Sequence, residues 1–268
     1  MNACGFTYVA TGRRFKEEAN VSCASLKKHM PDSHVTVFVD DEDGLQEGIY
    51  DQVIKIDTPN YSFYDKIHAF LNTPYQKTVY IDTDTFVCDQ VADLFEILDR
   101  FDVAAVRDHW SLEKQDCPRC FDDFNTGLVA FCNKPTVIEA IRSWEAIYRY
   151  QIENKVDVDH DQPAFRSAIY KHHDVTVYVL PKNYNLRLTS PIFLGYGFFP
   201  KILHGRSPDF PSIVRKLSKS DDFRFFLPNG SLVDRTDIGV IDKISGLPYN
   251  VFSAVGKAVT RILRKIKS

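Results

Sequence analysis

The sequence predicts an α/β protein built on a doubly wound, mostly parallel sheet. Up to residue 90, short apolar segments alternate with segments of helical periodicity. Such alternation is typical of βαβ units, whose strands run parallel. In sheets of this kind the functional residues lie beyond the carboxyl ends of the strands. The residues after Ala10, Val39 and Ile81 are therefore the first places to expect a site.

The elements of this first part follow in order. Strands are expected at 6–10, 34–39, 53–56 and 78–81, and helices at 17–29 and 64–72. The residues of the first helix expected to face inward are Ala19, Val21, Cys23 and Leu26. A polar loop at 11–14 and an acidic turn at 40–44 follow the first two strands.

The pattern after residue 84 is mixed. Strands are expected at 103–106, 126–131 and 175–180, and helices at 135–150 and 163–171. The stretch 183–211 is rich in aromatic residues, glycine and proline, and we expect it to form loops around a site.

The composition excludes several classes of protein. With 44% hydrophobic and 26% charged residues, the 268-residue chain is expected to fold around a sizeable core rather than to be disordered. A formal net charge of -3 gives no general affinity for nucleic acid. The first apolar run, 6–10, is far shorter than a membrane span and lacks the flanks of a secretory signal. We therefore expect a cytoplasmic protein.

The six cysteines do not predict a disulfide framework, because a chain of this length does not need one. Cys117 and Cys120 form a Cys-x-x-Cys pair, but structural zinc takes four ligands and no second pair lies at a suitable spacing. His109 and Cys132 are conceivable additional ligands. Ordinary reduced cysteines are the interpretation that we favour.

The pattern Asp82-Thr83-Asp84 comes directly after the strand expected at 78–81. Residues two apart on an extended chain point to the same side, so both carboxylates can reach one ion. Carboxylate oxygens favour Mg²⁺ or Mn²⁺ over softer metals. An ion there would neutralise a diphosphate leaving group. Two solvated acids in a turn are the plain alternative.

Further motifs accompany this pattern in a fixed order. They are the stretch 65–87 that contains it, Asp93-Leu94-Phe95, Phe124-Asn125-Thr126-Gly127 and Asp161-Gln162. Together they resemble the glycogenin-like glycosyltransferases over about residues 5–208. The resemblance implies a GT-A fold, which is Rossmann-like with helices on both faces of the sheet, a UDP-sugar as donor, and transfer with retention of configuration. It also implies a GT-A domain at 1–208 and a C-terminal extension at 209–268.

The resemblance assigns the donor-binding residues. The loop that includes Thr11 and Phe15 matches the one that encloses the nucleotide base, with Phe15 where the family usually has a stacking tyrosine. Lys66 matches a basic residue that contacts the donor. Core packing for Phe15 and a solvated helix position for Lys66 are the alternatives. The full set implied for donor binding is Val9, Ala10, Thr11, Phe15, Lys66, Asp82, Thr83, Asn125, Gly127, Gly205 and Arg206.

The same resemblance places residues near the transferred sugar. Asn125 matches a contact to donor or acceptor hydroxyls, and Gly127 would let the backbone approach closely. An ordinary turn is the alternative for both. Asp161 and Gln162 match the catalytic pair that faces the sugar. Because an amide is a poor nucleophile, we expect Gln162 to position and stabilise rather than to form a covalent intermediate.

His204 matches the third metal ligand beside Asp82 and Asp84, and an imidazole with two carboxylates suits Mn²⁺. Here the chain departs from the family, because the downstream Lys-Pro-Trp that follows the histidine is missing. The lysine of that motif touches the diphosphate, and Arg206 is the residue that could replace it.

The segment 251–268 carries five basic residues and no acid, and its apolar residues repeat at helical spacing. It predicts a basic amphipathic helix. Such a helix either packs on its own domain or contacts a membrane surface or a partner.

We therefore expect a metal-dependent hexosyltransferase with a UDP-sugar donor and a hydroxyl acceptor, which is a saccharide, a lipid-linked glycan or a protein. One alternative is a phosphatase of the haloacid dehalogenase type, with Asp82 as nucleophile and Asp84 as acid and base. Several βα units precede the motif, however, and only Asp122-Asp123 offers the second acidic motif of that family. The other alternative is a non-catalytic module that binds a sugar or nucleotide.

Overall fold

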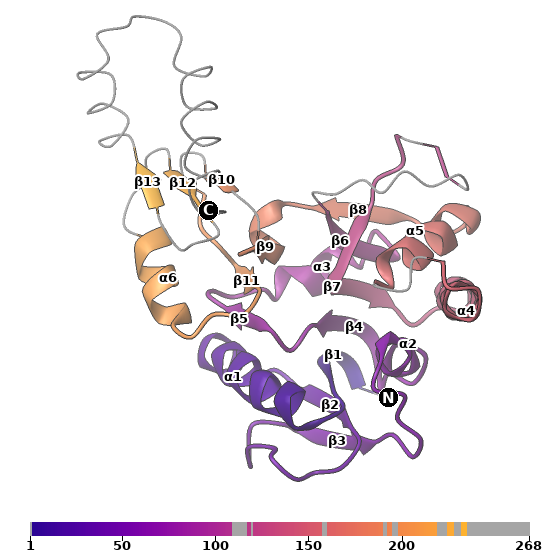
Figure 1. Cartoon of the computed structure of the whole chain (residues 1–268), viewed down its shortest axis with the longest axis horizontal. Helices are drawn as coiled ribbons and strands as arrows, with labels where there is room; N and C mark the ends of the chain where they lie inside the picture. Colours follow the sequence, from indigo (N-terminus) through magenta and orange to yellow (C-terminus); the bar gives the residue numbers. More distant parts are fainter. Residues whose placement is uncertain are drawn as a thin grey trace, which may run out of the picture.

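A computed structural model describes residues 2–108, 117–118, 120–156, 160–189, 192–194, 198–218, 224–227 and 232–234. Its largest feature is a mixed seven-stranded sheet with helices on both faces (Figure 1). In spatial order the strands are β3 (Gln52–Lys55), β2 (Val35–Val39), β1 (Asn2–Ala10), β4 (Tyr75–Ile81), β7 (Phe124–Cys132), β6 (Val103–Arg107) and β8 (Val177–Leu180). The predicted α/β class is confirmed.

All but one of these strands run in the same direction. β1 pairs in parallel with β2 and β4, β2 with β3, and β6 with β8, whereas β7 is antiparallel to both of its neighbours. In the β4–β7 ladder Ile81 lies opposite Leu128. The carboxyl end of β4 therefore meets the amino-terminal part of β7, and this reversal brings Asp82 close to the Asn125–Gly127 segment.

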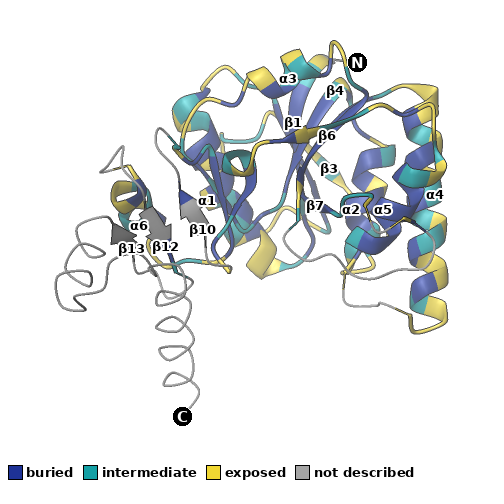
Figure 2. Cartoon of the chain, turned by 90° about the horizontal axis from the view of Figure 1, so that it is seen from above, coloured by how far each residue is buried: buried dark blue, intermediate teal, exposed yellow. Residues whose placement is uncertain are grey.

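The helices divide between two core clusters, one on each face of the sheet. α1 (Arg13–His29) and α3 (Asp93–Ile97) pack on one face, and α2 (Phe63–Leu71), α4 (Pro135–Glu153) and α5 (Gln162–Lys171) pack on the other. Because successive strand residues point to opposite faces, Val79 and Ile81 join the first cluster and Tyr80 joins the second. Figure 2 shows the buried strands between these helices.

Two expectations about the helix after the first strand are corrected. α1 begins at Arg13, four positions earlier than predicted. Ala19, Cys23 and Leu26 face the core as expected, but Val21 is 49% exposed. Positions 19, 23 and 26 follow the helical repeat, whereas position 21 falls about half a turn away from that stripe.

The stretch 183–211, which was expected to form loops, contains short regular elements. They are the end of η1 (Lys182–Asn185), β9 (Leu186–Arg187), β10 (Ile192–Leu194), β11 (Ile202–His204) and the start of α6 (Phe210–Leu217). β11 pairs with β9 and, in antiparallel register, with β5 (Thr85–Val87) (Figure 1). This pairing sets His204 opposite Thr85, directly after Asp84. The loop prediction is therefore correct only in part, because strands of two or three residues are too short to show a period.

The described part of the predicted extension packs with residues before 208. β12 (Arg224–Phe226) and β13 (Leu232–Asp234) form a three-stranded sheet with β10. Phe210, Leu217 and Phe226 share a core cluster with Leu186 and Leu203. The basic segment 251–268 lies outside the described residues. No helix in the described ranges has the length and apolar character needed to cross a membrane.

Candidate functional site

A cleft of about 810 Å³ opens where the carboxyl ends of β1 and β4 meet the start of β7. The predicted site residues that line it are Val9, Thr11, Phe15, Lys66, Asp82, Thr83, Asp84, Asn125, Gly127, Asp161, Gln162, His204 and Arg206. Two others do not line it. Ala10 is fully buried in the core, and Gly205 instead donates its backbone N–H to the carbonyl of Asp84 (2.8 Å). The donor contacts expected of Ala10 and Gly205 therefore stay predictions that the cleft lining does not support.

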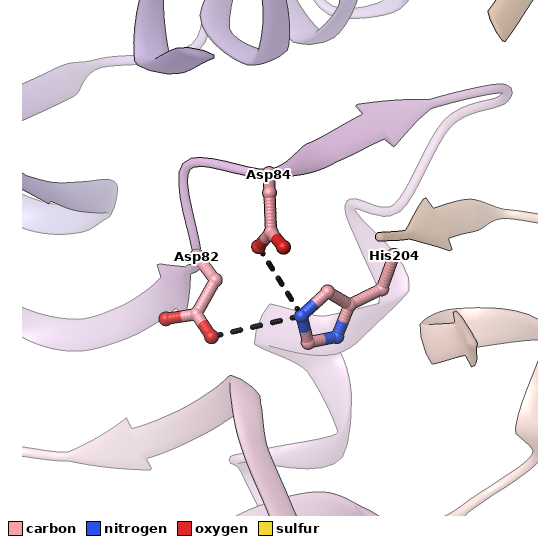
Figure 3. A group of neighbouring side chains, drawn as sticks. All are labelled: Asp82, Asp84 and His204. Carbon is pink, nitrogen blue, oxygen red and sulfur yellow. Dashed lines mark ion pairs between the residues drawn. The ribbon is translucent and has the colours of Figure 1, made fainter. Parts of the chain in front are cut away.

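Asp82, Asp84 and His204 form a group that could hold a metal ion (Figure 3). The Nε2 atom of His204 lies 3.7 Å from Oδ2 of Asp82 and 3.3 Å from Oδ1 of Asp84. All three ligand atoms lie within 4.8 Å of one another. Two carboxylate oxygens and one imidazole nitrogen suit Mn²⁺, and the carboxylates also suit Mg²⁺. The donor set therefore fits the divalent ion that the sequence predicts.

Three hydrogen bonds hold the turn that carries the two aspartates. The N–H of Asp82 donates to the carbonyl of Gly127 (2.8 Å), and the hydroxyl of Thr85 donates to the carbonyl of Asp82 (2.8 Å). The N–H of Gly205, whose φ of 128° favours glycine, completes the set at Asp84. The turn is thus fixed by β7, β5 and the residue after β11.

Gly127 makes room for the metal-binding group itself. A Cβ atom at this position would lie 2.2 Å from Cε1 of His204 and 2.8 Å from Oδ2 of Asp82. No side chain fits there without moving both residues. The sequence analysis expects Gly127 to let the backbone approach closely. In the structure, the imidazole of His204 takes the space of the missing side chain.

Lys66 is buried within an ionic network rather than solvated. Its Nζ lies 3.1 Å from Oδ1 of Asp82 and 3.5 Å from Oδ2 of Asp161, and it donates to the carbonyl of Thr126 (3.2 Å). Burial lowers the pKa of Lys66, but the charges of Asp161 and Asp82 outweigh this and raise it. The hydroxyl of Tyr80 donates to the same oxygen of Asp82 (2.7 Å). Lys66 therefore forms a charged bridge between the carboxylates of Asp82 and Asp161.

Asp161 is the most buried acid of the cleft. Burial raises its pKa, the charge of Lys66 lowers it, and the charge of Asp82 raises it further, so that the net shift is upward. Its Oδ1 accepts a hydrogen bond from the hydroxyl of Thr126 (3.0 Å). Among the described residues, its Oδ2 has no hydrogen-bond donor, although Lys66 lies close. This oxygen is itself buried, so Lys66 is the neighbour that balances its charge.

The side chain of Gln162 is hydrogen-bonded to one amide and to one further acid. Its Nε2 donates to Oδ2 of Asp108 (2.7 Å), and its Oε1 accepts from Nδ2 of Asn125 (3.2 Å). Arg187 lies 3.5 Å from the same oxygen of Asp108, and both line the cleft. Asp108 and Arg187 were not predicted. Asp108 directly follows β6, so the rule about the carboxyl ends of strands could have found it.

Two aromatic rings stand at the end of the cleft next to β1. Phe15 is 41% exposed and Tyr61 is 64% exposed, and both line the cleft. This exposure does not support the alternative that Phe15 packs in the core. The buried carboxylate of Asp65 accepts hydrogen bonds from the hydroxyl of Thr11 (2.8 Å) and from the N–H of Tyr61 (2.8 Å). Asp65 thereby ties Thr11, just before the helix that carries Phe15, to the loop that carries Tyr61. Tyr61 was missed by the sequence analysis.

The half-exposed side chain of Arg206 lies beside Asp84. Its guanidinium is 3.5 Å from Oδ2 of Asp84 and donates to Glu18 (2.7 Å), which also accepts from the hydroxyl of Thr83 (3.2 Å). Burial raises the pKa of Asp84, but the hydrogen bond and charge of His204 in its protonated form, together with the charge of Arg206, lower it to about 2. Asp84 is therefore ionised and ready to bind a cation.

The second acidic motif that the phosphatase alternative requires lies outside the cleft. Asp122 pairs with Arg107 (2.8 Å), and Asp123 pairs with Arg166 (3.1 Å). Neither acid lines the cleft. Their placement therefore gives no support to a phosphatase.

The cysteines behave as the favoured interpretation expects. Cys117 is buried, Cys120 is exposed, and the thiol of Cys132 donates to the carbonyl of Leu98 in the core (3.3 Å). The conceivable ligand His109 lies outside the described residues. Within the described ranges, no group of metal-ligating side chains includes Cys117 or Cys120.

The cleft combines three chemical capacities. It offers a hard-ligand set for a divalent cation, a neighbouring guanidinium for an anion, and a polar wall of carboxylates and amides for hydroxyl groups. A scan against models of protein families and a search of curated proteins find no match to this chain. The geometry and chemistry of the cleft therefore carry the functional argument.

Proposed function

We propose that the chain is a metal-dependent glycosyltransferase with a GT-A fold, which moves a hexose from a UDP-sugar to a hydroxyl acceptor with retention. The observation that carries the proposal is the convergence of Asp82, Asp84 and His204 in one cleft. His204 is far from the two aspartates in the sequence, yet the ligand atoms of all three residues lie within 4.8 Å of one another. The cleft volume, about 810 Å³, is in the range of small-molecule sites.

The aromatic end of the cleft suits the nucleotide base. Stacking on a base requires only an exposed ring face, which Phe15 and Tyr61 both offer. The loop of Thr11 is held in place by the buried Asp65, so the base would meet a preformed wall.

The metal-binding group lies where the diphosphate would follow. A bound Mn²⁺ or Mg²⁺ ion supplies positive charge to the leaving diphosphate. Arg206 adds a second positive charge beside Asp84 and can donate hydrogen bonds to phosphate oxygens. This arrangement supports Arg206 as the replacement for the lysine of the missing Lys-Pro-Trp motif.

Asp161, Gln162 and Asn125 form the wall assigned to the sugar. Asp161 is buried beneath the surface of this wall, where its carboxylate holds Lys66 and Thr126 in place. The amide of Gln162 is held at both ends, by Asp108 and by Asn125. A fixed neutral amide favours orientation and electrostatic stabilisation of the transition state over covalent catalysis.

The acceptor would enter along the rest of the cleft wall. This part is formed by Phe63, Tyr148 and Ile152, with His160 beside them. Its apolar surface can support the carbon face of a sugar ring or an aglycone. A saccharide, a lipid-linked glycan and a protein hydroxyl are all compatible with this surface.

Calorimetric titration with UDP, with and without Mn²⁺, tests the proposal. We expect UDP to bind only when the metal is present, and Asp84→Asn to abolish this binding without changing the fold. Asp89→Asn is the matched control, because Asp89 pairs with Lys201 outside the cleft. Absence of UDP binding under any metal condition would overturn the UDP-sugar assignment.

Turnover separates an enzyme from a binding module. Hydrolysis of UDP-glucose or UDP-galactose in the absence of acceptor would support transfer chemistry, provided that Asp84→Asn abolishes it. A chain that binds UDP through Asp84 and Mn²⁺ but hydrolyses or transfers no UDP-sugar would be the non-catalytic module instead.

A further inference from the structure

A chain of hydrogen bonds connects Asp108 to His204 through two asparagines. Nδ2 of Asn125 donates to Asp108 (2.9 Å), Nδ2 of Asn185 donates to Oδ1 of Asn125 (2.8 Å), and Oδ1 of Asn185 lies 2.7 Å from Nδ1 of His204. We propose that this chain fixes the tautomer of His204 and that Asn185 is a positioning residue for the metal site. The inference rests on the proposed function, because it takes His204 as a metal ligand.

Asp108 determines which group donates in each of these hydrogen bonds. An ionised carboxylate only accepts hydrogen bonds, so the amide of Asn125 must turn its NH₂ group toward Asp108. The N–H of Gly127 only donates, and it lies 3.0 Å from Oδ1 of Asn125. Both neighbours therefore require the same orientation of the Asn125 amide.

This orientation passes to the histidine. Because Oδ1 of Asn125 accepts, Asn185 must offer its NH₂ group there and its Oδ1 to His204. Nδ1 of His204 must then carry the hydrogen. In a neutral imidazole the lone pair is left on Nε2, which is the nitrogen that faces Asp82 and Asp84.

The chain of hydrogen bonds opposes the histidine tautomer that the two carboxylates alone would favour. Without Asn185, a hydrogen on Nε2 could bond to Asp84, whose Oδ1 is only 3.3 Å away. That hydrogen would occupy the position of the metal and would have to leave before an ion binds. Partners that fix the tautomer of a histidine ligand commonly change metal affinity by about 10–100-fold.

Burial makes the chain effective. Asn125 and Asn185 are each 2% exposed, and His204 is 7% exposed. Water therefore has little access to replace a lost partner, and a reversed amide would leave buried donors facing one another. Each link has one low-energy orientation as a result.

The inference is tested first with Mn²⁺ alone, by titration followed with electron paramagnetic resonance. Asn185→Leu removes both links, and we expect the dissociation constant for Mn²⁺ to rise about tenfold or more. In Asn185→Asp, a carboxylate still accepts from Nδ1 but cannot donate to Oδ1 of Asn125, so only part of the affinity should return. Asn183→Ala, in the same η1 segment, should bind Mn²⁺ like the wild type. Wild-type affinity in Asn185→Leu, or an equal loss in Asn183→Ala, overturns the inference.

A second measurement needs neither metal nor a destabilised variant. Nitrogen NMR of the wild-type chain, labelled at histidine side chains and studied where the imidazole is neutral, reports which ring nitrogen carries hydrogen. The His204→Gln variant assigns the signal. Hydrogen on Nδ1 supports the inference, and hydrogen on Nε2 overturns it. If the wild-type chain binds no Mn²⁺, the proposed metal site fails, and the NMR result decides the tautomer by itself.

Discussion

The hydroxyls of Ser22 and Thr85 lie 2.6 Å apart and join α1 to β5 directly behind the Asp82–Asp84 turn. Thr85 uses its hydrogen on the carbonyl of Asp82, so Ser22 must donate to Thr85. Tyr8 then lies 3.1 Å from Ser22, and all three hydroxyls are buried. A line of hydroxyl groups thus runs from the core to the Asp82–Asp84 turn.

Replacing Thr85 tests this support. In Thr85→Val the shape is kept, but the carbonyl of Asp82 and the hydroxyl of Ser22 lose a buried partner. We expect the free energy of unfolding to fall by about 1–3 kcal/mol, measured by urea denaturation, and Mn²⁺ to bind more weakly. Thr85→Ser keeps the hydroxyl and should retain Mn²⁺ affinity. Equal Mn²⁺ binding by the two variants would contradict the role of the hydroxyl.

Gly127 should tolerate no side chain. In Gly127→Ala the new methyl group lies within 2.2 Å of the present position of Cε1 of His204, so the imidazole must move. We expect Mn²⁺ affinity to fall about tenfold or more and stability to fall by about 1–3 kcal/mol. Gly44→Ala is the control, because it strains the backbone at a φ of 84° but meets no neighbouring atom. If both variants bind Mn²⁺ equally, the close packing at Gly127 is not needed for the site.

In the metal-free protein, Asp84 should make the free energy of unfolding depend on pH in the acidic range. Its folded-state pKa of about 2 lies below the ordinary value of 3.8, so its contribution is present above that value and is lost as the pH falls toward 2. The shift corresponds to roughly 2 kcal/mol. In the presence of a chelator, the melting temperature should fall more steeply from pH 5 to pH 2 for the wild type than for Asp84→Asn. Asp99→Asn, at an exposed acid, should follow the wild type; parallel curves for all three would refute the shift.

Arg206 should matter for the diphosphate and not for the ion. Arg206→Ala removes a charged donor beside Asp84, and we expect UDP affinity in Mn²⁺ to fall about tenfold or more. Binding of Mn²⁺ alone should be unchanged or tighter, because a neighbouring positive charge is lost. Arg14→Ala is a matched control, since Arg14 also pairs with Glu18 but does not line the cleft. Unchanged UDP affinity in Arg206→Ala would show that other groups hold the diphosphate.

Phe15 should contribute to binding of the base only. Loss of a stacked ring commonly costs about 1–3 kcal/mol per base. We therefore expect Phe15→Ala to weaken UDP binding about fivefold or more, while pyrophosphate binding stays the same. Phe15→Tyr should preserve UDP affinity. Tyr150→Ala, which removes an exposed ring outside the cleft, serves as control. An equal loss for pyrophosphate and UDP would point to a general distortion instead of lost stacking.

The sequence by itself determined the elements of the sheet and the position of its acidic turn. Alternating apolar and helical periods predicted β1, β2 and β4, because burial on a local repeat is visible in neighbouring residues. Asp82 and Asp84 were found for the same reason, since they directly follow β4.

The tertiary structure alone decided how these parts meet. The antiparallel direction of β7, the pairing of β11 with β5 and the burial of Lys66 between two acids all depend on contacts between distant segments. Asn185 shows the limit most clearly, because nothing in its local sequence distinguishes it from Asn183. Its importance comes from hydrogen bonds to His204 and Asn125, and the folded chain brings those partners together only through long-range packing.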